Sequence, residues 1–287
     1  MQILTTVAEV RAWRRGLPGS LGLVPTMGAL HEGHLTLARR ARAENDHVAA
    51  SIFVNPLQFG ANEDLDRYPR DLESDSAKLA KIGIDALFFP QVDEIYPEGF
   101  ATKVEVDGPL TAVLEGAARP GHFAGVTTVV SKLFFILQPA RAYFGMKDAQ
   151  QLLVIAKCVR DLDIDVQIVP VATVREADGM AMSSRNQYLT PEEREAARAI
   201  SRGLQQAEAR FAGGERAAAA LRAAVAAALE REPLLRAEYV SCAELPTLRE
   251  IERVQTTALL SLAVRVGGAR LIDNVWLGVQ KDAVPLV

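Results

Sequence analysis

Short apolar runs alternate with longer amphipathic segments along the first part of this chain. The apolar runs predict buried strands at 21–25, 48–54, 86–89, 142–144 and 164–169. Apolar positions at helical spacing predict helices between them, at 34–44, 72–82, 126–137 and 149–162. Strands that alternate with helices are joined by right-handed crossovers and form a parallel sheet. We therefore predict an α/β fold, with a Rossmann-like parallel-sheet domain over residues 1–173.

The pattern changes after residue 173. Thr190-Pro191-Glu192-Glu193 predicts a helix start, because it combines a Thr cap, a Pro at the first helical position and a Glu at the third. An alanine-rich segment at 217–228 predicts a further helix. Apolar runs predict strands at 238–242, 259–266 and 269–277, with Gly267-Gly268 as a hairpin turn. Helices followed by antiparallel strands indicate a smaller α+β domain over residues 174–287.

The most informative segment is 21–38, where an apolar strand enters a glycine-containing turn and then an amphipathic helix. The turn brings His31 and His34 to the start of that helix, whose free N–H groups and positive dipole end favour a phosphate. Imidazoles there can donate hydrogen bonds to a phosphorus centre as it gains negative charge. A zinc site is disfavoured, because the two histidines are three residues apart and a third ligand is missing from the pattern. The segment therefore indicates nucleotide chemistry.

Composition narrows the possible partners. The 287 residues are 49% hydrophobic and 24% charged, which is typical of a globular chain, and the net charge of −4 without a basic tract argues against nucleic acid. The longest apolar stretch, 126–137, is too short to span a membrane. The N-terminus lacks the pattern of a signal peptide, and the only cysteines, Cys158 and Cys242, lie in apolar patterns. We expect a cytoplasmic protein.

Three further segments carry candidate chemistry. In 145–151 a strand ends at a glycine, Lys147 stands at the junction with a helix, and Gln151 follows one turn later. In 180–186, Ser183, Ser184 and Arg185 suit the oxygens of a triphosphate. In 55–59 two amides can orient a small polar substrate. Taken alone, each of the three is also compatible with an ordinary turn or polar loop. The dinucleotide fingerprint and the Walker phosphate loop are both absent from the sequence.

Five motifs in order, P-T-M-G-A-L-H-E-G-H, V-N-P-L-Q-F, R-P-G-H-F-A-G-V, G-M-K-D-A-Q-Q and M-S-S-R-N-Q-Y-L, resemble the pantothenate synthetase (pantoate–β-alanine ligase) family. That family belongs to the nucleotidyltransferase superfamily with the HIGH motif, and the resemblance covers essentially the whole chain. It implies ATP-dependent condensation of pantoate with β-alanine through a pantoyl adenylate, with release of AMP and pyrophosphate. It also implies Mg²⁺ as a cofactor and a homodimer.

The resemblance assigns roles to individual residues. It implies His34, His31 and Lys147 as the catalytic residues. The second domain would close over the triphosphate, and the residues implied to bind ATP are Met27, Gly28, Ala29, Leu30, His31, Glu32, Gly33, His34, Gly145, Met146, Lys147, Asp148, Val174, Met182, Ser183, Ser184 and Arg185. Gln58 and Gln151 would hold pantoate, and Gln58 would also reach β-alanine. Pro25, Met27, Val129 and Val130 either pack against the pantoate methyl groups or belong to the core.

Some points stay open at this stage. The triphosphate itself would supply most Mg²⁺ ligands, and Asp75 is a weak protein candidate. Family members often carry G-E-K-D-aromatic where this chain has Met146 and Ala149 around Lys147-Asp148, so a carboxylate before the lysine has no counterpart here. The alternatives are a nucleotidyltransferase that acts on a phosphate acceptor and a non-catalytic RNA-binding relative of the synthetases. The second domain disfavours the first, and the sequence pI of about 5.7 disfavours the second.

Overall fold

The computed structural model describes residues 1–60, 63–279 and 284–286. The first domain is built on a six-stranded parallel sheet with strand order β1-β4-β3-β2-β5-β6. The strands are β1 Gln2–Leu4, β2 Leu21–Thr26, β3 His47–Ile52, β4 Ala86–Phe88, β5 Arg141–Gly145 and β6 Gln167–Val171. The predicted Rossmann-like fold is confirmed.

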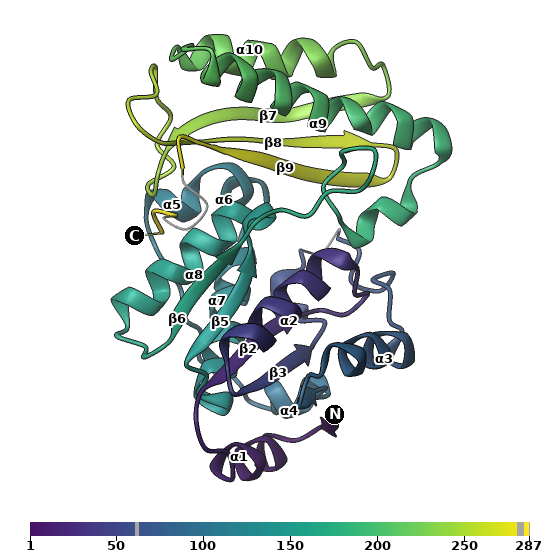
Figure 1. Ribbon diagram of the computed structural model, residues 1–287, viewed down its shortest axis with the longest axis vertical. Coiled ribbons are helices and arrows are strands. Elements are labelled where there is room, and N and C mark those ends of the chain that lie inside the picture. Colours follow the sequence, from purple (N-terminus) through teal and green to yellow (C-terminus); the bar gives the residue numbers. More distant parts are fainter. Residues whose placement is uncertain (61–62, 280–283, 287) are drawn as a thin grey trace.

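Helices cover both faces of this sheet, and each face has its own apolar core (Figure 1). One core joins the strands to α1 Val7–Arg15, α7 His122–Leu137 and α8 Ala149–Asp161. The other joins them to α2 Glu32–Glu44 and α3 Leu72–Ile82. Neighbouring positions on one strand belong to different cores, Leu23 to the first and Val24 to the second, as strand geometry requires. Such a doubly covered sheet explains the continuous apolar strands seen in the sequence.

Shorter helices complete the first domain. They are α4 Val92–Ile95, α5 Pro109–Ala112 and α6 Leu114–Ala118, with 3₁₀ helices η1 Pro56–Gln58 and η2 Met146–Asp148. The strand order reverses between β2 and β5, which pair through Gly22–Arg141 and Leu23–Ala142. Ligands of open α/β sheets bind at such a switch point, beyond the carboxyl ends of the strands. The His31–His34 turn follows β2 and the Lys147 turn follows β5, so both lie at that point.

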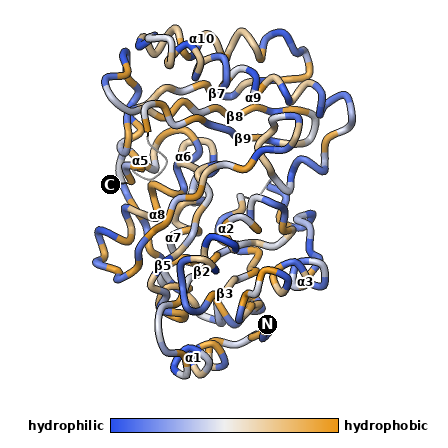
Figure 2. Tube along the Cα trace, viewed as in Figure 1, coloured by the Kyte–Doolittle hydropathy of each residue, from blue (hydrophilic) through white to orange (hydrophobic). Residues whose placement is uncertain are grey.

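The second domain is an antiparallel sheet of β7 Leu235–Glu244, β8 Ala258–Val266 and β9 Ala269–Leu277, covered on one face by α9 Pro191–Ala212 and α10 Ala218–Leu229 (Figure 1). A separate apolar core lies between sheet and helices. The opposite face lies toward the first domain, where Leu259 packs in a cluster with α8 residues. Hydrophobic positions gather along the strands, whereas hydrophilic ones lie on turns and outer helix faces (Figure 2). The 3₁₀ helix η3 Ser184–Tyr188 lies in the connection between the two sheets, and the boundary predicted near residue 173 falls in that connection.

The element predictions hold for most of the chain, with informative differences. The Thr190–Glu193 capping box and the Gly267-Gly268 hairpin are confirmed. β1 and α1 were not predicted, although Thr6 and Glu9 form a capping box that the sequence contains. β6 begins at Gln167 rather than at 164, because the Ile164 amide bonds back to the Val159 carbonyl at the end of α8. Among the described residues, none of the helices is long and apolar enough to cross a membrane.

Candidate functional site

A cavity of about 260 Å³ opens at the switch point, and a larger one of about 920 Å³ continues it between the two domains. Lys147, Asp148 and Arg185 line both. The sequence-predicted residues that line the inner cavity are Met27, His31, Gly33, His34, Gln58, Gly145, Lys147, Asp148, Gln151, Val174, Met182, Ser183, Ser184 and Arg185. Side chains from four segments far apart in the sequence therefore meet in one place.

The turn before α2 owes its shape to unusual backbone angles. Gly28 has φ of 85° and Ala29 φ of 51°, both in the left-handed region, which is rare for alanine. The Asp75 carboxylate fixes the turn by accepting the Leu30 N–H at 2.8 Å, and Lys78 donates to the Leu30 carbonyl at 2.8 Å. Asp75, the weak Mg²⁺ candidate, thus acts as a hydrogen-bond partner of this backbone in the described structure.

The two histidines lie one above the other, with ring centroids 4.1 Å apart. Gly33 makes room for this arrangement, since a Cβ there would lie 2.9 Å from the His31 ring. Nδ1 of His34 accepts the His31 N–H at 3.4 Å, so the neutral His34 ring carries its proton on Nε2. Burial, the His31 ring and Lys147 lower the pKa of His34 to about 3, and burial and Lys147 also lower the pKa of His31. Both rings are neutral near pH 7, and His34 can donate from Nε2.

The second turn places a charged pair beside the histidines. Lys147 Nζ lies 3.5 Å from Asp148 Oδ1. Withdrawal from water raises the pKa of Asp148, but Lys147 and Arg185 outweigh this and hold the pKa below its usual value. The Lys147 side chain is only 20% exposed and lines both cavities. The ammonium group is therefore available to an anion in the cavity.

Gln58 lies at the end of η1 and is nearly buried. Its Oε1 accepts from Asn55 Nδ2 at 3.0 Å, and its Nε2 lies 3.0 Å from the Met27 sulfur. Of the two amides predicted to orient a substrate, Gln58 lines the cavity, whereas Asn55 is buried and holds Gln58 and the Gly125 carbonyl. Gln151 lines the same cavity from the first turn of α8.

The segment Ser183–Arg185, which lines the cavity from the side of the second domain, is held by residues of the first domain. Arg185 forms two hydrogen bonds with the Asp64 carboxylate, at 2.8 and 3.1 Å. Ser184 Oγ donates to the Tyr68 hydroxyl at 3.4 Å, and Ser183 Oγ accepts the Arg185 N–H. Two hydroxyls and a guanidinium thus face the same space as Lys147.

Four predicted ATP-binding residues, in addition to Ala29, do not line the inner cavity. Glu32 pairs with Arg39 on the exposed side of α2, Leu30 is buried in the second core, and the Met146 side chain packs against the first core. Gly28 donates its N–H to Thr26 Oγ1 at 3.2 Å within the turn. A ligand would meet these four residues through their backbone or through the shape of the turn.

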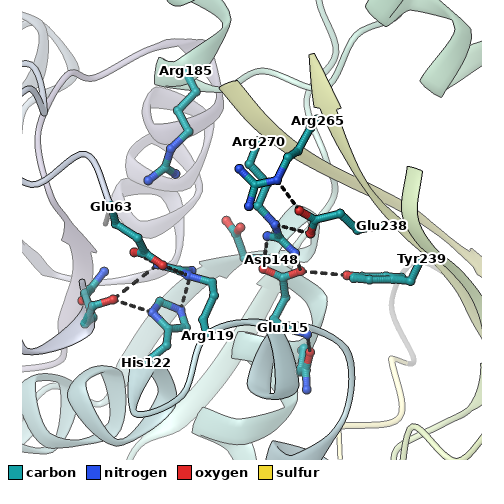
Figure 3. Close-up of polar contacts among 12 residues, drawn as sticks. Glu63, Glu115, Arg119, His122, Asp148, Arg185, Glu238, Tyr239, Arg265 and Arg270 are labelled. Atoms are coloured by element: carbon teal, nitrogen blue, oxygen red, sulfur yellow. Dashed lines mark hydrogen bonds and ion pairs between the residues drawn. The ribbon is translucent and has the colours of Figure 1, made fainter. Parts of the chain in front are cut away.

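Two clusters of polar side chains at the site were not predicted from the sequence (Figure 3). In the first, Arg119 pairs with Glu63 at 2.7 Å and donates to His122 Nε2 at 3.0 Å, while His122 Nδ1 donates to the Gln58 carbonyl at 2.8 Å. Burial and the Arg119 charge lower the pKa of His122 to about 4. The R-P-G-H-F-A-G-V motif contained Arg119 and His122, but no chemistry in the pattern assigned them a role.

The second cluster joins the two domains. Glu115 of α6 accepts two hydrogen bonds from Arg270 of β9, at 2.6 and 2.8 Å, and one from the Tyr239 hydroxyl at 2.9 Å. Arg270 also donates to Glu238 at 2.7 Å. Burial and Glu115 raise the pKa of Tyr239 well above its usual value. This network is built from segments more than 120 residues apart, and the sequence offers no signal for it.

Comparison with known proteins decides the family. The family model for pantoate–β-alanine ligase matches residues 2–276. The chain belongs to the pantoate–β-alanine ligase family. It is 60% identical to a pantothenate synthetase of Roseiflexus sp. (strain RS-1), over 96% of this chain and 98% of the relative. It is 56% identical to that of Moorella thermoacetica, over 98% of this chain and 100% of the relative. The protein is therefore a ligase, as the sequence predicted.

Solved structures of the family match the fold throughout. The pantothenate synthetase of Thermus thermophilus superposes with a TM-score of 0.92 at 52% identity, covering 96% of this chain and 99% of that one. The pantoate–β-alanine ligase of Francisella tularensis, solved with β-γ ATP and β-alanine, superposes with a TM-score of 0.80 at 35% identity, covering 96% and 97%. The arrangement of the two domains is thus that of the family.

Proposed function

We propose that this ligase joins pantoate to β-alanine through a pantoyl adenylate, with release of AMP and pyrophosphate. One observation carries the proposal: the His31–His34 turn, Lys147, and Ser183 to Arg185 line one cavity together with Gln58 and Gln151. Phosphate-binding groups and amides that suit a hydroxy acid thus share a site. The binding of β-γ ATP and β-alanine by the Francisella tularensis relative supports the choice of substrates.

In the first step, a pantoate carboxylate oxygen attacks the α-phosphorus of ATP. The bond from that phosphorus to the bridging oxygen breaks, and pyrophosphate leaves with the electron pair. Negative charge grows on the phosphoryl oxygens, so donors fixed in advance stabilise the transition state more than the ground state. His34 donates from Nε2, since its Nδ1 accepts the His31 N–H, and Lys147 supplies a positive charge.

In the second step, the amine of β-alanine attacks the acyl carbon of the adenylate. The acyl–oxygen bond breaks, AMP leaves, and the amine loses a proton as the amide forms. No protein nucleophile takes part. Gln58 binds pantoate and reaches the amine, and Gln151 binds pantoate from the first turn of α8. Pro25, Met27, Val129 and Val130 also line the cavity and would contact the pantoate methyl groups.

The nucleotide would lie across the switch point. Gly145 to Asp148 would hold it from the first domain, with Val174 near the adenine. Met182, Ser183, Ser184 and Arg185 would cover the triphosphate from the second domain, which we take as residues 174–287. The predicted homodimer and cytoplasmic location stay predictions.

Mg²⁺ is best treated as part of the nucleotide substrate. In residues 1–60, 63–279 and 284–286, three or more His, Cys, Asp or Glu side chains nowhere gather so that they could hold a metal ion. Asp75, the protein candidate, uses its carboxylate on the Leu30 backbone. The triphosphate oxygens would supply most ligands of the ion.

Isotope exchange between ATP and pyrophosphate tests the proposal. Exchange that requires pantoate but proceeds without β-alanine is expected, because the adenylate forms before the amine enters. The Lys147→Ala protein is the matched control, and it should lose most of this exchange. Exchange that starts only when β-alanine is added would exclude the adenylate sequence, and exchange without pantoate would point to a different nucleotidyl acceptor.

A further inference from the structure

Strand β9 of the second domain contacts the backbone of the Lys147 turn. Asn274 Nδ2 donates to the Lys147 carbonyl at 2.7 Å and to the Met146 carbonyl at 3.2 Å. Trp276, two residues on along the same face of β9, places its indole Nε1 3.4 Å from the same Met146 carbonyl. Two side chains of one domain thus hold two consecutive carbonyls of the other.

Asn274 is buried at the contact between the two domains. Asn274 is only 5% exposed, and its backbone N–H donates to Asp273 Oδ1 at 2.8 Å. Asp273 is in turn held by Arg175 through bonds of 2.7 and 3.1 Å. Since a buried side chain with fixed neighbours loses little further freedom, its hydrogen bonds set a definite position for whatever they hold.

The segment that these side chains hold is the short 3₁₀ helix η2. It has three residues, Met146–Asp148, and short 3₁₀ turns have poorer hydrogen-bond geometry than α-helices. Lys147 is the middle residue, so a shift of its carbonyl moves the start of its side chain. The backbone from which the Lys147 side chain projects is therefore held by the second domain.

We propose that Asn274 is a positioning residue for catalysis, which acts by fixing the backbone of Lys147 when the two domains are packed together. The inference rests on the proposed role of Lys147 at the phosphates. It assigns the second domain a task besides covering the triphosphate, because β9 aligns a group of the first domain.

A double-mutant cycle tests this inference. Asn274→Ala removes both bonds, and Asn274→Asp keeps the size but replaces the donor with an acceptor that faces two carbonyl oxygens. Each should lower kcat about 10- to 100-fold, the scale of a roughly 1 Å misplacement. The pantoate KM should stay near that of the unmodified protein, since Gln58 lies on a different segment and Gln151 is held within helix α8 rather than in the turn. In a Lys147→Ala background, the same changes should cause no further loss, because residues that act as a unit are not additive.

Ser241→Ala is the matched control. Ser241 lies in the same cross-strand row as Asn274, through Ser261, and is buried, but its hydroxyl makes no hydrogen bond among the described residues. Its kcat should equal that of the unmodified protein. Trp276→Phe, which keeps the ring contact and removes one donor, should cause a smaller loss than Asn274→Ala.

The outcomes separate the two proposals. An equal fold loss from Asn274→Ala with and without Lys147 would overturn the positioning role alone, as would an unchanged kcat in Asn274→Ala and Asn274→Asp. Unchanged turnover in Lys147→Ala by itself would instead overturn the proposed role of Lys147, and this inference with it.

Discussion

The Asn55 side chain donates a hydrogen bond of 3.0 Å to Oε1 of Gln58 and thereby fixes which end of the Gln58 amide faces the cavity. Asn55 is itself held from two sides: its Nδ2 also donates to the Gly125 carbonyl at 3.0 Å, and its Oδ1 accepts the Tyr96 hydroxyl at 2.8 Å. Nε2 of Gln58 donates one N–H to the Met27 sulfur at 3.0 Å and keeps its second N–H as a donor for a substrate. A carboxylate or hydroxyl of a substrate is a suitable acceptor for it.

Asn55→Ala should therefore raise the KM for pantoate even though Asn55 is buried behind the cavity wall. The effect should be similar to that of Gln58→Ala, with a smaller change in kcat, because the amide binds ground state and transition state alike. Steady-state kinetics with pantoate as the varied substrate measure this. An unaltered pantoate KM in both proteins would contradict the role of Gln58.

His34→Ala and Lys147→Ala should each lower kcat by roughly 10²–10³, the usual loss when one fixed donor to a developing oxyanion is removed. The fold should survive, because both side chains line the cavity rather than the cores. Turnover at saturating substrates gives kcat, and circular dichroism checks the fold. Arg39→Ala, on the exposed side of the same helix α2 as His34, should retain normal turnover. Normal turnover in His34→Ala would exclude this histidine from the transition state.

Acid should destabilise the protein through His122. The native pKa is about 4 against an ordinary 6.5, because burial and Arg119 disfavour the charged ring. Between these values the unfolded chain binds a proton that the native chain does not, so stability is kept above pH 6.5 and lost as pH falls toward 4. From pH 7 to pH 5 this one group accounts for roughly 2 kcal/mol of the free energy of unfolding.

His122→Gln should remove that part of the pH dependence. Urea denaturation at pH 7 and pH 5 gives the change in the free energy of unfolding between the two pH values, once for the unmodified protein and once for His122→Gln. The other titrating groups contribute equally to both changes. Equal pH dependence in the two proteins would show that His122 is charged in the native state or exposed to water.

Arg270→Met should destabilise the protein by about 3–5 kcal/mol, the cost of leaving a buried charge unpaired. The Glu115 side chain is only 8% exposed, and Arg270 supplies its two charged hydrogen bonds. A second change, Glu115→Gln, should recover much of the loss, because the uncompensated charge is gone.

Arg39→Ala is the comparison for this pair. It breaks the ion pair between Arg39 and Glu32, whose side chains are 52% and 45% exposed. The free energy of unfolding should therefore fall by less than about 1 kcal/mol. Thermal or urea unfolding gives the stability of Arg270→Met, of its combination with Glu115→Gln, and of Arg39→Ala. Equal losses in Arg270→Met and Arg39→Ala would contradict a buried, desolvated pair at the domain interface.

Local chemistry allowed much of this protein to be predicted. The strand and helix alternation, the Thr190 capping box and the glycine hairpin are set by residues close together in the sequence, so periodicity and capping rules find them. The His31, His34 and Lys147 turns were found for the same reason, since each is a strand-to-helix junction. β1 was missed because three residues at a sheet edge leave too short a pattern.

The sequence by itself determined most helices and strands of the two domains, and it predicted the side chains that we propose to carry the chemistry. Only the tertiary structure decided how they meet. The order of strands places the turns after β2 and β5 side by side, and packing of the second sheet on the first domain brings Asn274 to Lys147 and Arg270 to Glu115. The physical reason is that these contacts form only when the face of one sheet or helix packs against another. The two residues of each contact lie more than 100 positions apart, so no periodic pattern in the sequence reports that they meet.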